Sequence, residues 1–361
     1  MTNMSLRAAV GSLMVVGLET TELSEMERSW LRVVRPAGII LFRRNIGDAR
    51  QTRALLEAAC AECAADAMRC VDMEGGTVDR LREALAPMPS AQAVAWHRSA
   101  KLAREQGMLT AQAVRAFGMN TTLAPVLDLG LPESREVMGT RTAAADAKGV
   151  IAYARSFLKG LATQGVTGCG KHFPGLGGGT LDSHQQMPAI ERSFEQMMNE
   201  DIEPFRALRS VLSMVMVSHA AFPQTEGGAT PASLSRFWIE KVLRGRVGYR
   251  GLIFSDDMEM GGVLGARQIE EAAVMALDAG MDVIEICHRT DLILRAFEAV
   301  LREAEQSGAF RAMVQRRARR VAAWRRKHLC KEMSAMPTAT ELEELRTSMQ
   351  RFHKRVVQEQ T

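Results

Sequence analysis

Eight short runs rich in apolar and β-branched residues recur along this chain, and helix-like stretches separate them. Several runs are apolar throughout, which is typical of parallel strands buried on both faces. Because strands that alternate with helices form parallel sheets, eight such units predict a closed (β/α)8 barrel, the TIM barrel. The expected strands are Leu13–Gly17, Gly38–Phe42, Met68–Asp72, Asn120–Val126, Val166–Phe173, Met214–His219, Gly251–Asp256 and Asp282–Cys287.

A doubly wound sheet is the structural alternative, and it would carry a glycine-rich phosphate-binding turn after its first strand. Gly17 is followed by Leu18 and Glu19, and no G-x-G-x-x-G pattern occurs there. The barrel is therefore favoured. The clearest helices expected around it are Ala49–Ala67, Ala103–Phe117, Ala145–Gln164, Phe194–Leu212 and Ile269–Ala279.

The character of the chain changes beyond residue 330. A loop-like stretch containing Pro337 leads into a polar amphipathic segment, Glu341–Gln358, which predicts a helix packed on the outside of the barrel. We therefore expect a single catalytic domain over residues 1–330 and a C-terminal helical extension over residues 331–361.

Charge and hydropathy exclude several classes of function. Of the 361 residues, 24% are charged and 47% hydrophobic, and no run approaches the roughly 20 apolar residues that a bilayer crossing needs. The net charge of +4 depends on one segment, residues 311–331, which holds nine Lys or Arg and no Asp or Glu. Aromatic residues make up only 5%, so a solvated helix face explains this segment better than a nucleic-acid groove. We expect no nucleic-acid partner and no membrane span.

The six cysteines do not resemble a disulfide scaffold, which is short and rich in cysteine. Cys60 and Cys63 form a C-x-x-C in an Ala-rich helical segment, with no second pair to complete a zinc site. Reduced thiols, together with an apolar run over residues 8–18 that lacks a cleavage pattern, predict a cytoplasmic protein. A monomer is favoured, and neither a cofactor nor a metal ion is expected.

Polar side chains stand at the carboxyl ends of the expected strands, where TIM barrels carry their active sites. Because neighbouring strand residues point to opposite faces, we expect only one of Asp256 and Asp257 to face the pocket. An aspartate there can attack an electrophilic carbon, accept a proton or bind a metal, while the other caps a helix. The residues at the strand ends are Asp72, Asp128, Lys171–His172, His219 and Asp256–Asp257.

Asp182 and His184 lie two residues apart, just after the glycine-rich stretch 175–179. In a suitable turn the carboxylate can hold one imidazole nitrogen and leave the other free to transfer a proton near neutral pH. The structural alternative is a loop in which both side chains only cap turns.

Two arginines on loops are candidates for the same pocket. Arg80 follows Asp72 and a Gly-Gly turn closely enough to return as its ion-pair partner, and Arg141 lies on a later loop. With Lys171 and His172 they would supply donors suited to hydroxyl or carbonyl groups.

Together these segments resemble glycoside hydrolase family 3, and within it the single-domain bacterial β-N-acetylglucosaminidases of peptidoglycan recycling. The separate motifs follow the family's order over nearly the whole barrel. They are Gly38–Asn45, Asp72–Arg80, Leu123–Asp128, Lys171–Gly175, Asp182–His184, Pro231–Ser235, Ser255–Met258 and Ala276–Asp282.

The resemblance implies roles for individual residues. Asp256 matches the family's nucleophile, which attacks the anomeric carbon and forms a covalent glycosyl-enzyme. His184 matches the general acid/base, and Asp182 matches the residue that orients it. The implied activity is a retaining exo-β-N-acetylglucosaminidase that removes terminal GlcNAc from muropeptides. The residues implied to bind the non-reducing sugar are Asp72, Arg80, Arg141, Lys171 and His172.

The sequence also departs from the family pattern. Leu176 stands where the family usually has a second histidine, and a Gly-Gly-Gly-Thr run replaces a more polar loop. Thr77 and Asp79 stand where Arg and Gln are more frequent. None of these changes removes a residue implied to be catalytic.

Several alternatives stay open from the sequence. A histidine acid/base could tolerate phosphate, which would make the protein a glycoside phosphorylase, and the altered loop could leave a sugar-binding relic. Another sugar specificity, such as β-glucosidase, agrees less well with the resemblance. A metal-dependent barrel hydrolase would use His172, His184, His219 and Asp256, but no H-x-H or H-E-x-x-H spacing supports it.

Overall fold

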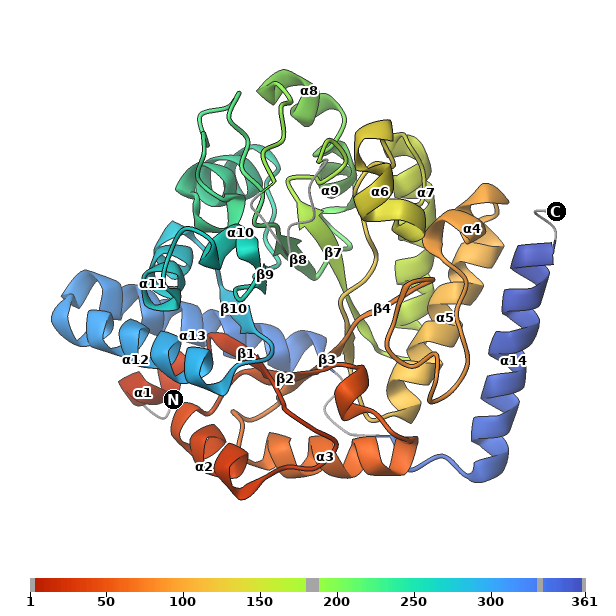
Figure 1. Ribbon diagram of the computed structural model, residues 1–361, viewed down its shortest axis with the longest axis horizontal. Coiled ribbons are helices and arrows are strands. Elements are labelled where there is room, and N and C mark those ends of the chain that lie inside the picture. The colour runs from red at the N-terminus through yellow and green to blue at the C-terminus, as the bar shows by residue number, and fades with distance from the viewer. Residues whose placement is uncertain (1–3, 180–187, 330–333, 359–361) are drawn as a thin grey trace.

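Eight parallel strands close into a barrel in the computed structural model, which describes residues 4–179, 188–329 and 334–358 (Figure 1). Each strand pairs with the next along the barrel, and the last pairs with the first. The predicted (β/α)8 barrel is therefore confirmed. In order, the barrel strands are β1 (Met14–Gly17), β2 (Gly38–Leu41), β3 (Met68–Val71), β6 (Thr121–Thr122), β7 (Thr167–Phe173), β8 (Met214–Val217), β9 (Leu252–Asp257) and β10 (Val283–Ile286).

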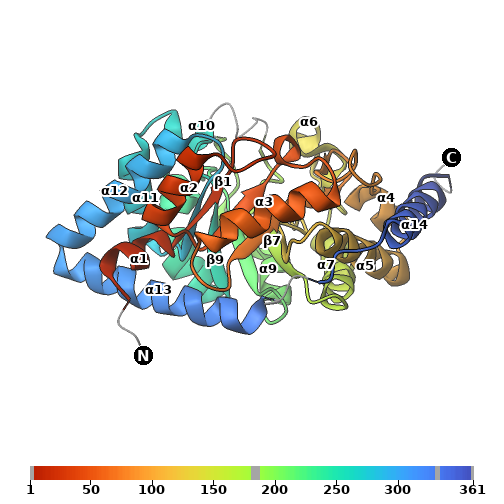
Figure 2. The same ribbon diagram turned by 90° about the horizontal axis from the view of Figure 1, so that it is seen from below.

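Helices surround the barrel, and a separate hairpin of β4 (Met73–Gly75) and β5 (Val78–Asp79) follows β3 (Figures 1 and 2). The α-helices are α1 (Leu6–Gly11), α2 (Glu25–Val34), α3 (Ala49–Ala61), α4 (Ala91–Trp96), α5 (Ala100–Ala116), α6 (Arg135–Met138), α7 (Ala147–Ala162), α8 (Phe194–Asn199), α9 (Glu203–Leu208), α10 (Gly261–Leu264), α11 (Ile269–Ala279), α12 (Thr290–Gln306), α13 (Gly308–His328) and α14 (Ala339–Gln358). Other helical turns are η1 (Arg43–Asn45), η2 (Pro132–Ser134), η3 (Gly139–Arg141), η4 (Ala232–Leu234) and η5 (Phe237–Arg246).

Two expected elements differ from the structure. The helix expected over Phe194–Leu212 is two short helices, α8 and α9, and Pro204 stands in the first turn of α9. Proline fits a first helical turn but cannot continue a helix through its interior. Of the strand expected over Asn120–Val126, Thr121–Thr122 form a regular strand, and Val126 adds an isolated parallel bridge to Lys171.

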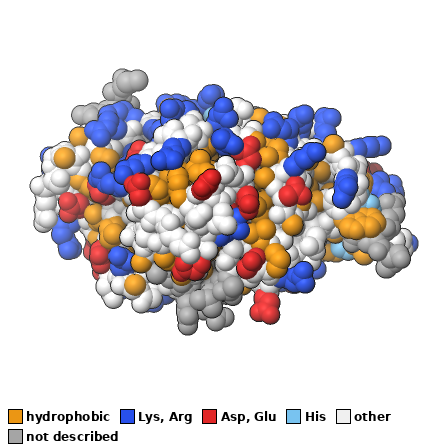
Figure 3. Space-filling view, turned by 90° about the horizontal axis from the view of Figure 1, so that it is seen from above, with side chains coloured by type: hydrophobic (Ala, Val, Ile, Leu, Met, Phe, Trp, Pro, Cys, Tyr) orange, Lys and Arg blue, Asp and Glu red, His pale blue; other side chains and the backbone are white. Residues whose placement is uncertain are grey.

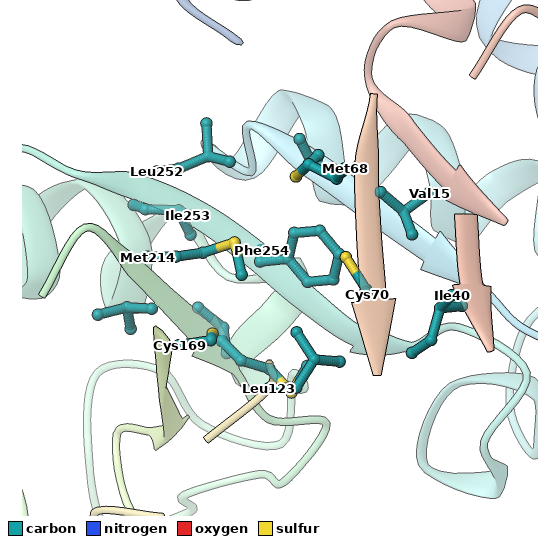
Figure 4. Packing of buried hydrophobic residues seen from close by; sticks show 14 of the residues in the cluster. Val15, Ile40, Met68, Cys70, Leu123, Cys169, Met214, Leu252, Ile253 and Phe254 are labelled. Carbon is teal, nitrogen blue, oxygen red and sulfur yellow. The ribbon is translucent and has the colours of Figure 1, made fainter. Parts of the chain in front are cut away.

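The barrel interior is filled by side chains from all sides, as Figure 4 shows for Met214, Phe254 and Cys70 among others. These residues are fully buried, so the barrel is a packed core and not a channel. Burial on both faces explains why the strand sequences are almost continuously apolar. The packed interior leaves the carboxyl ends of the strands as the place for a site.

Two strands gain an extra residue near their carboxyl ends. On β7, Gly170 pairs with Val215 and Phe173 with Val217, so the chain advances three residues on β7 while it advances two on β8. On β9, Phe254 pairs with Val283 and Asp257 with Glu285, again three residues against two. Each is a β-bulge, which interrupts the alternation of side chains between the two faces.

The long basic helix α13 lies against the amino ends of the strands, beside α1 and α12 (Figure 2). Its side chains donate to backbone carbonyls one or two residues before strands: Arg317 to Met281, Arg320 to Gly251, Arg325 to Ala37 and Trp324 to Ser213. Lys and Arg gather along the upper edge of the face in Figure 3. Three of the nine basic residues of segment 311–331 therefore satisfy carbonyl groups at the amino ends of the strands.

The C-terminal helix α14 packs on α5 and α4, and it buries Met349, Phe352 and Val356 (Figure 1). Arg346 on this helix donates to the backbone oxygen of Leu85. The predicted helix over 341–358 is confirmed, while the proposed domain boundary at residue 330 stays a prediction. No helix within the described ranges combines the length and the apolar character that a bilayer crossing requires.

Candidate active site

A cavity of about 390 Å³ opens at the carboxyl ends of the barrel strands. Loops and strand ends from β3, β7, β9 and β10 contribute its polar side chains. Six residues that the sequence analysis proposed from distant segments all line it. They are Asp72, Arg80, Arg141, Lys171, His172 and Asp256.

Both aspartates at the end of β9 line this cavity, so the expectation that only one would do so is wrong. The bulge on β9 is the reason, because its extra residue breaks the alternation of side chains. Ser255 bridges the interruption: its hydroxyl donates to the Asp256 carbonyl at 2.7 Å and accepts the Glu285 N–H at 2.9 Å. The bulge thereby places two adjacent carboxylates at one opening.

Asp256 is held in its ionised form. Burial opposes ionisation, but the charges of His172, His219 and Lys171 outweigh it and lower the pKa of this carboxyl. The backbone N–H of Asp257 donates to Asp256 Oδ1 at 2.9 Å, which also favours the charged form. A carboxylate of this kind, facing a cavity, has the charge state that a nucleophile needs.

Lys171 and His172 lie within the register shift of β7, and both line the cavity. Lys171 Nζ lies 2.8 Å from Asp72 Oδ1 and 2.6 Å from Glu74 Oε1. Burial lowers its pKa, but these two carboxylates outweigh burial and raise the pKa of the ammonium overall. Lys171 is therefore a permanently charged link between β7 and the loop after β3.

Asp72 also faces Arg80, whose guanidinium lies 3.4 Å from Asp72 Oδ2, as the sequence had suggested for an ion-pair partner. Arg80 Nε is buried and has no hydrogen-bond partner among the described residues. A buried donor without a partner is costly, so this N–H is suited to an incoming acceptor such as a sugar oxygen.

Arg141 binds Glu74 through two hydrogen bonds of 2.8 and 2.9 Å, and it reaches to 3.5 Å from His172 Nε2. Burial raises the pKa of the Glu74 carboxyl, but Arg141 and Lys171 outweigh burial and lower it well below its usual value. Glu74 was missed in the sequence because it lies within the hairpin after β3 and not at a strand end.

Asp128 positions His172 through contacts with both its backbone and its ring. Its carboxylate accepts the His172 backbone N–H at 3.2 Å and lies 2.7 Å from His172 Nδ1. It also accepts the N–H of Leu176 at 2.8 Å. Leu176 is thus tied to the same carboxylate as His172 through its backbone, while its side chain lines the cavity.

His219 has both ring nitrogens engaged, with Nδ1 2.6 Å from Ser233 Oγ and Nε2 3.0 Å from the Asp257 carbonyl. His219 therefore has no ring nitrogen left to bind a metal ion, which argues against a metal-dependent hydrolase that uses it. His219 instead supports the loop that carries the two aspartates.

Three further cavity residues come from β10 and the loop behind it: Glu285, Cys287 and His288. Glu285 is buried, and Oε1 of its carboxyl has no partner among the described residues. Burial, followed by the nearby carboxylates of Asp257, Asp72 and Asp256, raises the pKa of Glu285 well above its usual value. An apolar strand pattern interrupted by a single glutamate was the only signal for it in the sequence.

Asp182 and His184 lie outside the described residues, so their relation to the cavity stays a prediction. The five cysteines within the described part of the chain are free thiols.

Comparison with known proteins identifies the family. The model of the glycosyl hydrolase family 3 N-terminal domain matches residues 5–323. The chain belongs to glycosyl hydrolase family 3. It is 37% identical over 295 residues to a beta-hexosaminidase of Xanthomonas oryzae pv. oryzae, covering 80% of this chain and 87% of that protein. A beta-hexosaminidase of Bordetella avium is also 37% identical, over 279 residues, with 75% and 79% covered.

Solved structures of the family agree in fold. A family 3 beta-N-acetylglucosaminidase from Paenibacillus sp. str. FPU-7 superposes with a TM-score of 0.86 at 29% identity, covering 97% of this chain and 68% of that one. A beta-N-acetylhexosaminidase from Beutenbergia cavernae gives 0.81 at 26% identity, with 90% and 99% covered. This family 3 chain is therefore a glycoside hydrolase related to the beta-hexosaminidases.

Proposed function

We propose that this family 3 enzyme is a retaining exo-β-N-acetylglucosaminidase that removes terminal GlcNAc from peptidoglycan-derived muropeptides in the cytoplasm. The observation that carries the proposal is the ionised Asp256 in a cavity lined by donors and acceptors for sugar hydroxyls. A volume of about 390 Å³ lies at the small end of ligand pockets and suits one sugar ring. Relatives named beta-hexosaminidase support the choice of sugar.

In this proposal five residues of the cavity hold the non-reducing sugar: Asp72, Arg80, Arg141, Lys171 and His172. The cations are paired with carboxylates, so their N–H groups are fixed in place before substrate arrives. Donors that are already fixed lose little conformational entropy when the sugar binds, so more of the binding energy can serve to position the sugar for reaction.

The reaction would run through two displacements. Asp256 attacks the anomeric carbon and forms a covalent ester while the bond to the leaving oxygen breaks, and protonated His184 gives that oxygen its proton. Neutral His184, oriented by Asp182, then takes a proton from water, which attacks the same carbon and releases Asp256. A histidine acid places no second negative charge beside the nucleophile.

Replacement of Asp256 by Ala tests the nucleophile. Hydrolysis of an aryl β-GlcNAc substrate should fall to background in the folded variant. In the wild-type enzyme a slow 2-fluoro sugar should leave its label on Asp256, as read by peptide mass spectrometry. A label on another residue, or turnover by the variant at the wild-type rate, would contradict the assignment.

His184→Ala tests the acid. The variant should lose more activity on substrates with poor leaving groups, such as GlcNAc-containing muropeptides, than on activated aryl glycosides. Equal losses on both would argue against an acid role. Products formed with and without phosphate distinguish hydrolysis from phosphorolysis, and the proposal requires free GlcNAc in both.

A further inference from the structure

The carboxyl ends of β9 and β10 bring three different metal-binding side chains to one edge of the cavity. Oxygen, sulfur and nitrogen atoms of Asp257, Cys287 and His288 all lie within 4.8 Å of one another. We propose that these residues form a binding site for a divalent transition-metal ion of the zinc type, placed beside the nucleophile candidate.

The three side chains are already oriented toward a common point. His288 Nδ1 lies 3.3 Å from Asp257 Oδ2, and the Cys287 side chain hydrogen-bonds to the same aspartate. The other carboxylate oxygen, Oδ1, accepts the Glu259 N–H at 3.1 Å, which fixes the plane of the carboxylate. One carboxylate oxygen is thus held by the backbone and the other is directed at the remaining two ligands.

His288 is held at the cavity rim by its neighbours. Its ring packs on Phe42 with centroids 5.0 Å apart, and its backbone N–H donates to Glu259 Oε1 at 2.6 Å. The side chain keeps about half of its surface exposed, so it can approach an ion without disturbing the core. At bond lengths of 2.0–2.3 Å, ligands around tetrahedral zinc lie about 3.5 Å apart, so closure needs a shift of about 1 Å.

A second observation points to the same place. Glu285 lies on the same face of β10 as Cys287, two residues away, and its buried Oε1 has no partner among the described residues. Glu285 therefore adds a buried oxygen without a partner beside the three ligands, while the Arg44 guanidinium is engaged by the backbone carbonyls of Leu18 and Cys287.

The type of ligand selects the ion. A thiolate and an imidazole favour zinc and similar ions, whereas magnesium and calcium prefer oxygen ligands alone. When the metal–sulfur bond forms, the thiol proton passes to the solvent. Three protein ligands leave a fourth position for water or for a substrate oxygen.

Because the ligands line the cavity that holds Asp256, a bound ion and a sugar would compete for the same space. We therefore expect Zn²⁺ to inhibit glycoside hydrolysis reversibly, with full recovery after addition of a chelator. This arm of the test rests on the proposed function, whereas direct metal binding does not.

The binding experiment uses the full chain, after treatment with a chelator, and titrates it with Zn²⁺ by calorimetry and with Co²⁺ by absorption. The wild type should bind one ion and show a near-ultraviolet thiolate-to-cobalt band. Cys287→Ser should abolish the band, and both Cys287→Ser and His288→Asn should weaken Zn²⁺ binding at least tenfold. His288 is partly exposed, so its variant remains informative if the cysteine variant does not fold.

Cys60→Ser is the matched control, since Cys60 is a partly exposed thiol on α3 that does not line the cavity. It should bind Zn²⁺ and Co²⁺ like the wild type. The proposal is overturned if the wild type binds no Zn²⁺, if both site variants bind it with wild-type affinity, or if Cys60→Ser alone removes binding.

Discussion

At the scale of single residues, the site is built from charges that neutralise one another. Glu74 lies between Lys171 and Arg141, and Asp72 lies between Lys171 and Arg80, so each of the three Lys and Arg side chains that line the cavity in the described ranges is paired with a carboxylate. Such buried pairs cost free energy to desolvate and are expensive to break, because removal of one partner leaves the other uncompensated. Their value is a fixed geometry for the groups that face the substrate.

Glu74→Gln tests this balance. The variant leaves two cations without their shared carboxylate and should lower the free energy of unfolding by about 3–5 kcal/mol at pH 7. The folded-state pKa of Glu74 is lowered, so its contribution is complete above its usual value and is lost as the pH falls through the folded pKa. The deficit of the variant should therefore shrink below about pH 4.5 in urea unfolding experiments.

Glu343→Gln serves as the control, since Glu343 lies exposed on α14 in an ion pair with Arg346. Its effect should stay within about 0.5 kcal/mol at both pH values. A deficit for Glu74→Gln that grows on acidification would contradict the assignment of charge.

At the scale of elements, two β-bulges decide which residues reach the cavity. The pattern of short apolar runs predicted eight parallel strands, and the closed barrel confirms them, although the fourth strand is much shorter than expected. It could not predict that Lys171–His172 and Asp256–Asp257 would each present both side chains, because a bulge depends on the register of the partner strand. Glu74 and Glu285 were not predicted as site residues for a related reason: their environment forms only when strands that are distant in sequence come together.

Ser255→Ala tests the bulge on β9. The change removes the hydroxyl that links the Asp256 carbonyl to the Glu285 N–H, at a cost of about 1–3 kcal/mol. Because Asp256 would be held less firmly, kcat should fall about tenfold or more while KM changes little. Steady-state kinetics on an aryl glycoside provide the measurement.

The matched control is Ser29→Ala, at an exposed serine of α2 whose hydroxyl bonds within the helix. It should leave both kinetic constants unchanged. If Ser255→Ala raises KM at constant kcat, the serine contributes to substrate binding and not to the placement of Asp256.

At the scale of the whole molecule, the candidate active site and the helix α13 lie at opposite ends of the barrel. The cavity occupies the carboxyl ends of the strands, α13 covers the amino ends, and α14 packs on the outer side of α5. The separation predicts that the outer helix can be weakened without loss of catalysis. Three arginines of the basic segment, Arg317, Arg320 and Arg325, donate to carbonyl groups at the amino ends of the strands, whereas Arg311, Arg316, Arg319, Arg326 and Lys327 are exposed.

Phe352→Ala tests this separation. The Phe352 side chain belongs to α14 and is fully buried, so its truncation should lower the free energy of unfolding by about 3–5 kcal/mol. At 25 °C, where the variant remains folded, kcat should equal that of the wild type. Val357→Ala, at an exposed position of the same helix, should change stability by no more than about 0.5 kcal/mol. A fall in kcat for folded Phe352→Ala would show that α14 is coupled to the site.

The helix that seals the amino ends of the strands has a consequence for synthesis. Four carbonyl groups, next to β2, β8, β9 and β10, find their donors on a segment that follows every strand in the chain. Three of these carbonyls also accept a hydrogen bond from within the barrel: Ala37 from the Met68 N–H, Ser213 from the Leu252 N–H and Gly251 from Arg244. While the ribosome still holds residues 308–328, they lack the second donor that α13 supplies, so the last contacts at the amino ends of the strands form only after translation has passed this helix.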